Sequence, residues 1–153
     1  MSPKIVNREP FLALGISRRL ASEDQNEQVF KSIWDEFEAR LEEIRAHSID
    51  GAFYGLSFSG DQPGAVDYVA AIAVAPSMPI PAGFVLREVP TSQYAVFECG
   101  VPSIGETYRF IFGKWLPGSS FELSPAAPTF ERYPPVGQES SPVLIHVPIK
   151  EAE

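Results

Sequence analysis

The sequence has little of what several classes of protein require. It contains one cysteine, Cys99, so no internal disulfide can form and a reducing compartment is the simpler assumption. Its longest apolar run, residues 69–75, is far shorter than the roughly 20 residues that span a bilayer. The first nine residues lack the apolar core of a secretory signal. We therefore expect a cytoplasmic protein with no membrane partner.

Basic residues and histidines are also scarce. Twelve Lys and Arg stand against twenty Asp and Glu, and the net charge of -8 repels phosphate backbones, so we expect no direct nucleic-acid partner. His47 and His146 have no second histidine or cysteine at ligand spacing, which argues against a structural metal site. No glycine-rich phosphate loop is present, and we expect no cofactor.

What the chain does have is a folded protein's apolar content and two amphipathic segments. Of its 153 residues, 44% are hydrophobic and 12% aromatic. Residues 26–46 are predicted to form one long helix, because apolar side chains recur every three or four positions. A second apolar stripe covers residues 104–116 and ends at Pro117 and Gly118. Ser103 and Glu106 have the spacing of a capping box at its start.

Extended segments alternate with these helices in the same order in both halves. Residues 11–17, 52–58 and 66–74 are predicted strands of the first half, with a turn at 59–64. Residues 84–89, 93–99, 129–133 and 143–147 are those of the second half, and the proline-rich stretch 76–83 separates the halves. We expect one α+β domain over residues 1–153, in which pseudo-repeats of about 3–75 and 83–149 each form a β-α-β-β unit. Their strands form an antiparallel sheet with two helices packed on it and a central ligand groove between them.

Glu131 is the most informative charged residue. Strand alternation places Thr129, Glu131 and Tyr133 on one face, with Phe130 and Arg132 on the other. A carboxylate directed into an aromatic cavity is unfavourable without a partner, and a cationic ligand relieves that cost. The alternative is that Glu131 is solvated at the surface and pairs with Arg132 or with another base.

Aromatic residues are plentiful enough to wall such a groove. A cation over an aromatic face gains about 0.5 to 2 kcal/mol, which favours flat or lipophilic cations as ligands. The same residues at helical spacing are equally typical of an ordinary core, and Cys99 in its apolar strand is expected to be buried. The candidates for the groove wall are Trp34, Phe37, Tyr54, Tyr68, Tyr108, Phe112, Trp115 and Tyr133.

Short segments along nearly the whole chain, from about Val6 to Ile149, resemble the GyrI-like small-molecule-binding family, also called the AraC-type effector-binding domain. Each is tolerant alone, but their order and spacing together are fairly specific. They are Ile33-Trp34-Asp35-Glu36-Phe37, Tyr54-Gly55, Asp67-Tyr68, Val89-Pro90, Tyr94-Ala95-Val96-Phe97, Lys114-Trp115-Leu116-Pro117-Gly118-Ser119, Phe130-Glu131-Arg132-Tyr133 and Ile145-His146-Val147-Pro148-Ile149.

The resemblance implies a central cavity that accepts diverse, often cationic, aromatic compounds. It places the family's ligand-facing acid on Glu131 and the aromatic wall on Tyr68 and Trp115, with Tyr54 and Tyr133 as further members. Relatives often carry a DNA-binding domain, for which we expect no room here. Two alternatives to a binding protein stay open: a hydrolase that opens cyclopropane-type rings with Glu131, and a module that binds a protein partner such as gyrase. Whether the protein is an enzyme is thus left undecided.

Overall fold

A computed structural model describes residues 2–60, 62–77 and 79–153. Asp61, in the predicted turn, and Met78, in the predicted linker, lie outside the described residues. In the first half the elements are β1 (Lys4–Arg8), β2 (Phe11–Leu20), α1 (Glu27–Arg40), β3 (Phe53–Ser59) and β4 (Val66–Val74). In the second half they are β5 (Val85–Val89), β6 (Ser92–Cys99), α2 (Ile104–Phe110), β7 (Phe121–Leu123), β8 (Thr129–Tyr133) and β9 (Val143–Glu151).

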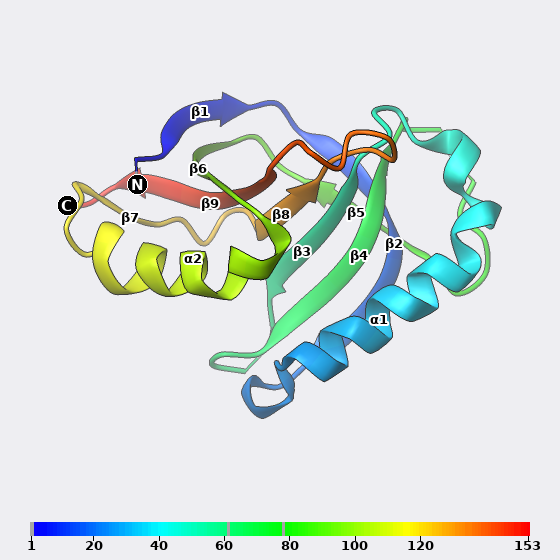
Figure 1. Ribbon diagram of the computed structural model, residues 1–153, viewed down its shortest axis with the longest axis horizontal. Coiled ribbons are helices and arrows are strands. Elements are labelled where there is room, and N and C mark those ends of the chain that lie inside the picture. The colour runs from blue at the N-terminus through cyan, green and yellow to red at the C-terminus, as the bar shows by residue number, and fades with distance from the viewer. Residues whose placement is uncertain (1, 61, 78) are drawn as a thin grey trace.

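The strands of the described residues form one antiparallel sheet in the order β1-β6-β9-β8-β3-β4-β2-β5, with β7 added beside β9. Its centre is the pair β3 and β8, one from each half of the chain; the halves also pair through β1 with β6 and through β2 with β5. Both helices cover the same face of this curved sheet, α1 over the first half and α2 over the second (Figure 1). The predicted fold class, an α+β antiparallel sheet with two helices packed on it, is confirmed. The boundaries of the pseudo-repeats stay a prediction.

The first helix is shorter than its apolar pattern suggested. It begins after Asn26, whose side chain accepts a hydrogen bond of 3.0 Å from the Val29 amide, and it ends at Arg40. Two 3₁₀ turns, Leu41–Glu43 and Arg45–His47, continue the chain. Leu41 and Ile44 are buried all the same. A spacing of three residues suits a 3₁₀ turn as well as an α-helix, so the sequence pattern did not separate the two.

The second helix starts and ends differently from the prediction. The prediction of a capping box is wrong, because the Ser103 side chain makes no capping hydrogen bond. The backbone carbonyl of Ser103 instead accepts a 2.8 Å hydrogen bond from the Thr107 hydroxyl. A 3₁₀ turn, Val101–Ser103, leads directly into the first residue of the helix, Ile104. After Phe110 the helix widens into a π-helical turn, Ile111–Trp115, in which the Leu116 amide bonds to the Ile111 carbonyl at 2.8 Å.

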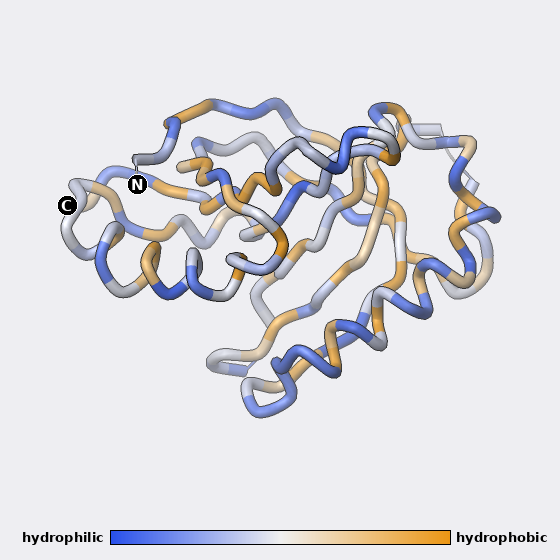
Figure 2. The backbone as a smooth tube through the Cα atoms, in the orientation of Figure 1, coloured by the Kyte–Doolittle hydropathy of each residue, from blue (hydrophilic) through white to orange (hydrophobic). Residues whose placement is uncertain are grey.

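Apolar side chains fill both faces of the sheet, and Figure 2 shows strand β4 as mostly hydrophobic, whereas hydrophobic and hydrophilic residues alternate along α1. Two clusters lie under the helices, one below α1 and one below α2. A third lies on the opposite face and contains Tyr54, Tyr94 and Phe130. Because the two clusters under the helices are separate, the surface of β3 and β8 between them is where polar groups can gather.

Three details of the strands were not predicted. β1 and β7 were missed, and β9 runs past Pro148 to Glu151, although the proline was expected to end it. The Pro148 carbonyl still accepts a 2.9 Å hydrogen bond from the Ser124 amide. Among the described residues, no helix has both the length and the apolarity to cross a membrane.

Candidate functional site

Glu131 occupies the centre of the face that carries the helices. It lies on β8 opposite Gly55 of β3, at the line where the two halves pair. Its side chain is 7% exposed, so the carboxylate is buried and not solvated at the surface. Strand alternation sends Phe130 to the opposite face, where it joins the third cluster.

The buried carboxylate is held by two phenol groups. The Tyr108 hydroxyl of α2 donates a short hydrogen bond to Oε2, and the Tyr133 hydroxyl donates one of 3.1 Å to Oε1. In the described part of the chain, none of the ion pairs includes Glu131. The surface pairing with Arg132 is therefore absent from these contacts. A buried carboxylate held by neutral donors lacks the counter-charge that usually accompanies such a group.

Burial controls the protonation of this cluster. Loss of solvent raises the pKa of Glu131 to about 7, although the hydrogen bonds from Tyr108 and Tyr133 act in the opposite direction. Burial and the nearby Glu131 charge raise the pKa values of both tyrosines above the ordinary value. The phenols therefore remain protonated donors near neutral pH, whereas the carboxyl group is poised between its two forms.

A further hydrogen bond, between two residues of the first half of the chain, lies beside Glu131. The Trp34 indole N–H donates to the Tyr68 hydroxyl at 2.9 Å. Gly55 lies below this group: a Cβ there would come within 2.4 Å of the Tyr68 hydroxyl and 3.0 Å of Glu131 Oε1. The absence of a side chain at Gly55 thus makes the space in which Tyr68 and Glu131 come together.

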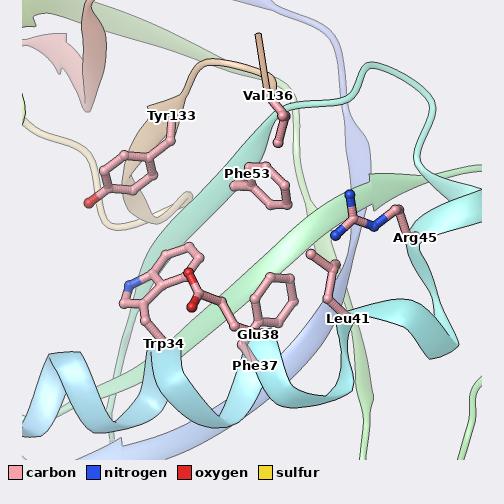
Figure 3. Close-up of a pocket in the computed structure, with 8 residues that line it drawn as sticks. All are labelled: Trp34, Phe37, Glu38, Leu41, Arg45, Phe53, Tyr133 and Val136. Atoms are coloured by element: carbon pink, nitrogen blue, oxygen red, sulfur yellow. The ribbon is translucent and has the colours of Figure 1, made fainter. Parts of the chain in front are cut away.

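An apolar groove of about 550 Å³ opens beside the cluster, between α1 and the segment after β8. Figure 3 shows the side chains that line it. They are Trp34, Phe37, Glu38, Leu41, Arg45, Phe53, Tyr133 and Val136. Glu131 is not among them, because the rings of Trp34 and Tyr133 meet edge to face at 5.5 Å between centroids. These two rings form the inner end of the groove.

The predicted site residues divide into two groups. Glu131, Tyr68, Tyr108, Tyr133 and Trp34 are brought together, and Phe37 lines the groove next to Trp34. The remaining three, Tyr54, Trp115 and Phe112, lie outside this group.

Tyr54 faces the opposite side of the sheet, where its hydroxyl donates to Asp50 at 2.6 Å and accepts from Arg8 at 3.3 Å. Because its neighbour Gly55 faces the helices, Tyr54 must point away from them. Trp115 packs on Phe97 at 5.2 Å in the core below α2.

Phe112 is 41% exposed and stacks on Tyr108 at 6.2 Å, so it supports the cluster from outside. Cys99 is only half-buried, contrary to expectation, because it is the last residue of β6. The described residues contain no group of three or more His, Cys, Asp and Glu side chains suited to a metal ion.

Several groove residues were not predicted. Gly55 was noticed only as part of a short motif, and its role depends on which strand face it occupies. Phe53, two residues earlier, shares that face, so alternation from Gly55 is the signal that finds it. Arg45 and Val136 lie in turns, where no periodicity indicates a direction.

A curved antiparallel sheet that carries two helices, with a half-open aromatic groove between α1 and the segment after β8 and not between the two helices, is the arrangement expected of a small-molecule-binding domain of the effector-binding class. Residues 4–149 match the family described as Cass2, integron-associated effector binding protein. The chain belongs to this family, and the resemblance to GyrI-like effector-binding domains is confirmed.

The chain is also similar to a curated regulator and to several solved structures. It is 29% identical over 136 residues to the transcriptional regulator BrlR of Pseudomonas aeruginosa, which covers 87% of this chain and 48% of BrlR. The chain thus spans about half the length of that relative.

Among solved structures, SAV2435 bound to tetraphenylphosphonium matches with a TM-score of 0.78 and 20% identity over 98% of this chain and 94% of that one. An integron cassette protein from the mobile metagenome of Vibrio cholerae matches with a TM-score of 0.63 and 15% identity over 97% and 96%. At these identities the two structures show a shared fold.

Proposed function

We propose that the groove binds lipophilic cations that carry aromatic rings, and that Glu131 is their charge anchor. The observation that carries this proposal is a carboxylate, 7% exposed, whose hydrogen-bond donors are the phenols of Tyr108 and Tyr133. A cation that reaches this carboxylate restores the missing counter-charge in a site with little water, where charges interact strongly.

The aromatic walls add to the same preference. Trp34 and Tyr133 present rings at the inner end of the groove, and a cation over such a face gains about 0.5 to 2 kcal/mol. SAV2435, which has the same fold, is bound to tetraphenylphosphonium, a cation with four phenyl rings. That ligand belongs to the other protein, but its chemistry suits the groove found here.

Access to Glu131 requires a small rearrangement. Since the rings of Trp34 and Tyr133 close the inner end of the groove, a ligand that contacts the carboxylate must displace the Tyr133 ring. Tyr133 gives up its 3.1 Å hydrogen bond in this step, while Tyr108 keeps its own. Rotation of one half-buried aromatic side chain is a local change that needs no movement of the sheet.

A titration with tetraphenylphosphonium tests the proposal. The wild-type protein, Glu131→Gln and the control Glu88→Gln are compared by calorimetry at pH 8. Glu88 is an exposed carboxylate on the edge strand β5, so its variant makes the same change in net charge away from the groove. We expect about tenfold or greater loss of affinity in Glu131→Gln and none in the control. No saturable binding by the wild type, or equal affinity in all three proteins, contradicts the proposal.

A second candidate function, hydrolysis of a strained or activated small molecule, is favoured by the pKa of Glu131 near 7. A group poised near the working pH is suited to general acid–base catalysis. In such a reaction Glu131 takes a proton from water, the water oxygen bonds to a ring carbon, and the carbon that loses its ring bond takes up a proton. Mass spectrometry after incubation with a panel of cyclopropane-containing electrophiles tests this: an enzyme gives more than one equivalent of product.

A further inference from the structure

The outer end of the groove carries a positive charge. Arg45, in the 3₁₀ turn after α1, lines both the main groove and an adjoining hollow of about 280 Å³. The two spaces share Leu41, Phe53 and Val136 as well, so they adjoin each other at Arg45. Figure 3 shows the terminal nitrogens of the Arg45 guanidinium directed toward the groove.

The present partner of Arg45 does not hold it firmly. Its Nε contacts Glu42 at 2.9 Å, and the two side chains are 52% and 83% exposed. Exposed pairs of this kind contribute little to stability and exchange readily with other partners. A guanidinium also offers several donors in a planar fork, which matches the geometry of a carboxylate.

Negative charge is gathered at the opposite end. Glu38 lines the groove next to Trp34 (Figure 3), and Glu131 lies behind the Trp34 and Tyr133 rings. The groove therefore has one carboxylate, Glu38, beside Trp34, a second, Glu131, behind its inner end, and the Arg45 guanidinium at its other end, with apolar walls between. A uniformly cation-selective site gains nothing from an arginine in its wall, because like charges repel.

We propose that the natural ligand is a zwitterion or a similar two-ended compound: an aromatic molecule with a basic group for the inner end and a carboxylate for Arg45. The inference of a basic group in the ligand depends on the proposed function of Glu131. The inference of an acidic group depends on Arg45 alone, and it makes Arg45 a specificity-determining residue. The adjoining hollow beyond Arg45, lined in part by Ser48 and Gly51, gives room for the acidic group and its water.

Two dyes that differ only at one group test the proposal. Rhodamine 123 is a methyl ester and a monocation, and rhodamine 110 is the corresponding free acid and a zwitterion at neutral pH. Fluorescence anisotropy gives the dissociation constant of each dye for wild type, Arg45→Gln and Arg45→Lys. The control is Lys31→Gln, which removes a positive charge from a 75% exposed side chain of α1, outside the groove.

The measured quantity is the ratio of the ester's dissociation constant to the acid's, because it cancels the general effect of each variant. We expect this ratio to fall about three- to tenfold in Arg45→Gln, to recover in part in Arg45→Lys, and to stay unchanged in Lys31→Gln. Arg45 is exposed, so the fold does not depend on it.

Other outcomes separate the two proposals. An equal ratio in wild type and Arg45→Gln, with the ester bound, overturns the role of Arg45 and leaves the cationic site intact. If neither dye nor tetraphenylphosphonium binds the wild type, both proposals are wrong.

Discussion

Replacement of Glu131 by glutamine is expected to stabilise the empty protein at alkaline pH. The carboxyl group has an ordinary pKa of 4.5 and a value of about 7 in the folded state. Between these values the native protein binds more protons than the unfolded chain, so its free energy of unfolding falls as the pH rises. A shift of this size corresponds to about 3 kcal/mol, at 1.36 kcal/mol per pKa unit, and the penalty is complete above pH 7.

Glutamine has nearly the same shape and no charge, so it escapes this penalty. It still accepts one phenol hydrogen bond through its amide oxygen, but its NH₂ group faces the second phenol, which costs about 1 kcal/mol. At pH 8 we therefore expect Glu131→Gln to be more stable than the wild type by about 2 kcal/mol. Well below pH 4.5 the carboxyl group is protonated in both the folded and the unfolded state, and the variant should be equal or slightly less stable there.

Urea denaturation from pH 4 to 8.5, followed by the fluorescence of Trp34 and Trp115, measures the difference. It must be taken between variant and wild type at each pH, because burial lowers the pKa of His146 from 6.5 to about 4. That histidine gives the opposite trend between these values, and it does so in both proteins. Glu88→Gln serves as the exposed control. A difference between Glu131→Gln and wild type that does not change with pH refutes the reasoning.

The remaining predictions concern the same cluster. Affinity for tetraphenylphosphonium should rise about tenfold per pH unit below pH 7 and level off above it, since the cation needs ionised Glu131; calorimetry from pH 5.5 to 8.5 should find no such rise in Glu131→Gln. Gly55→Ala should destabilise the protein by about 1 to 3 kcal/mol in urea, because its Cβ would lie 2.4 Å from the Tyr68 hydroxyl; unchanged stability would mean that the cluster is loosely packed. Trp34→Phe removes the N–H donor to Tyr68 and should weaken tetraphenylphosphonium binding several-fold, whereas Trp115→Phe should not.

The sequence was most informative where a repeating pattern met a single charged residue. The apolar stripes located both helices, and period-two alternation in residues 129–133 correctly placed Glu131 and Phe130 on opposite faces. The same rule could not be applied to Tyr54, because nothing in its neighbours fixed which face of the strand it occupies. Had Gly55 been assigned to the helix face, Tyr54 would have followed to the other one.

Other parts of the site depend on features that sequence periodicity does not contain. The π-helical turn Ile111–Trp115 changes the direction of Trp115, which therefore packs in the core below α2. Arg45 and Val136 reach the groove from a 3₁₀ turn and a loop, and their positions are set by the tertiary path of the chain. The closing contact between Trp34 and Tyr133 joins residues 99 positions apart by number, so local patterns could not reveal it.

The pairing of β3 with β8 gives the site a dual origin. Glu131, Tyr108 and Tyr133 come from the second half of the chain, whereas Trp34, Tyr68 and Gly55 come from the first. Neither half can hold a guest by itself, and any guest that fills the space touches both. A bound ligand therefore stabilises the pairing of the two halves at β3 and β8. The amide protons of these two central strands should exchange more slowly with deuterated water when the ligand is bound.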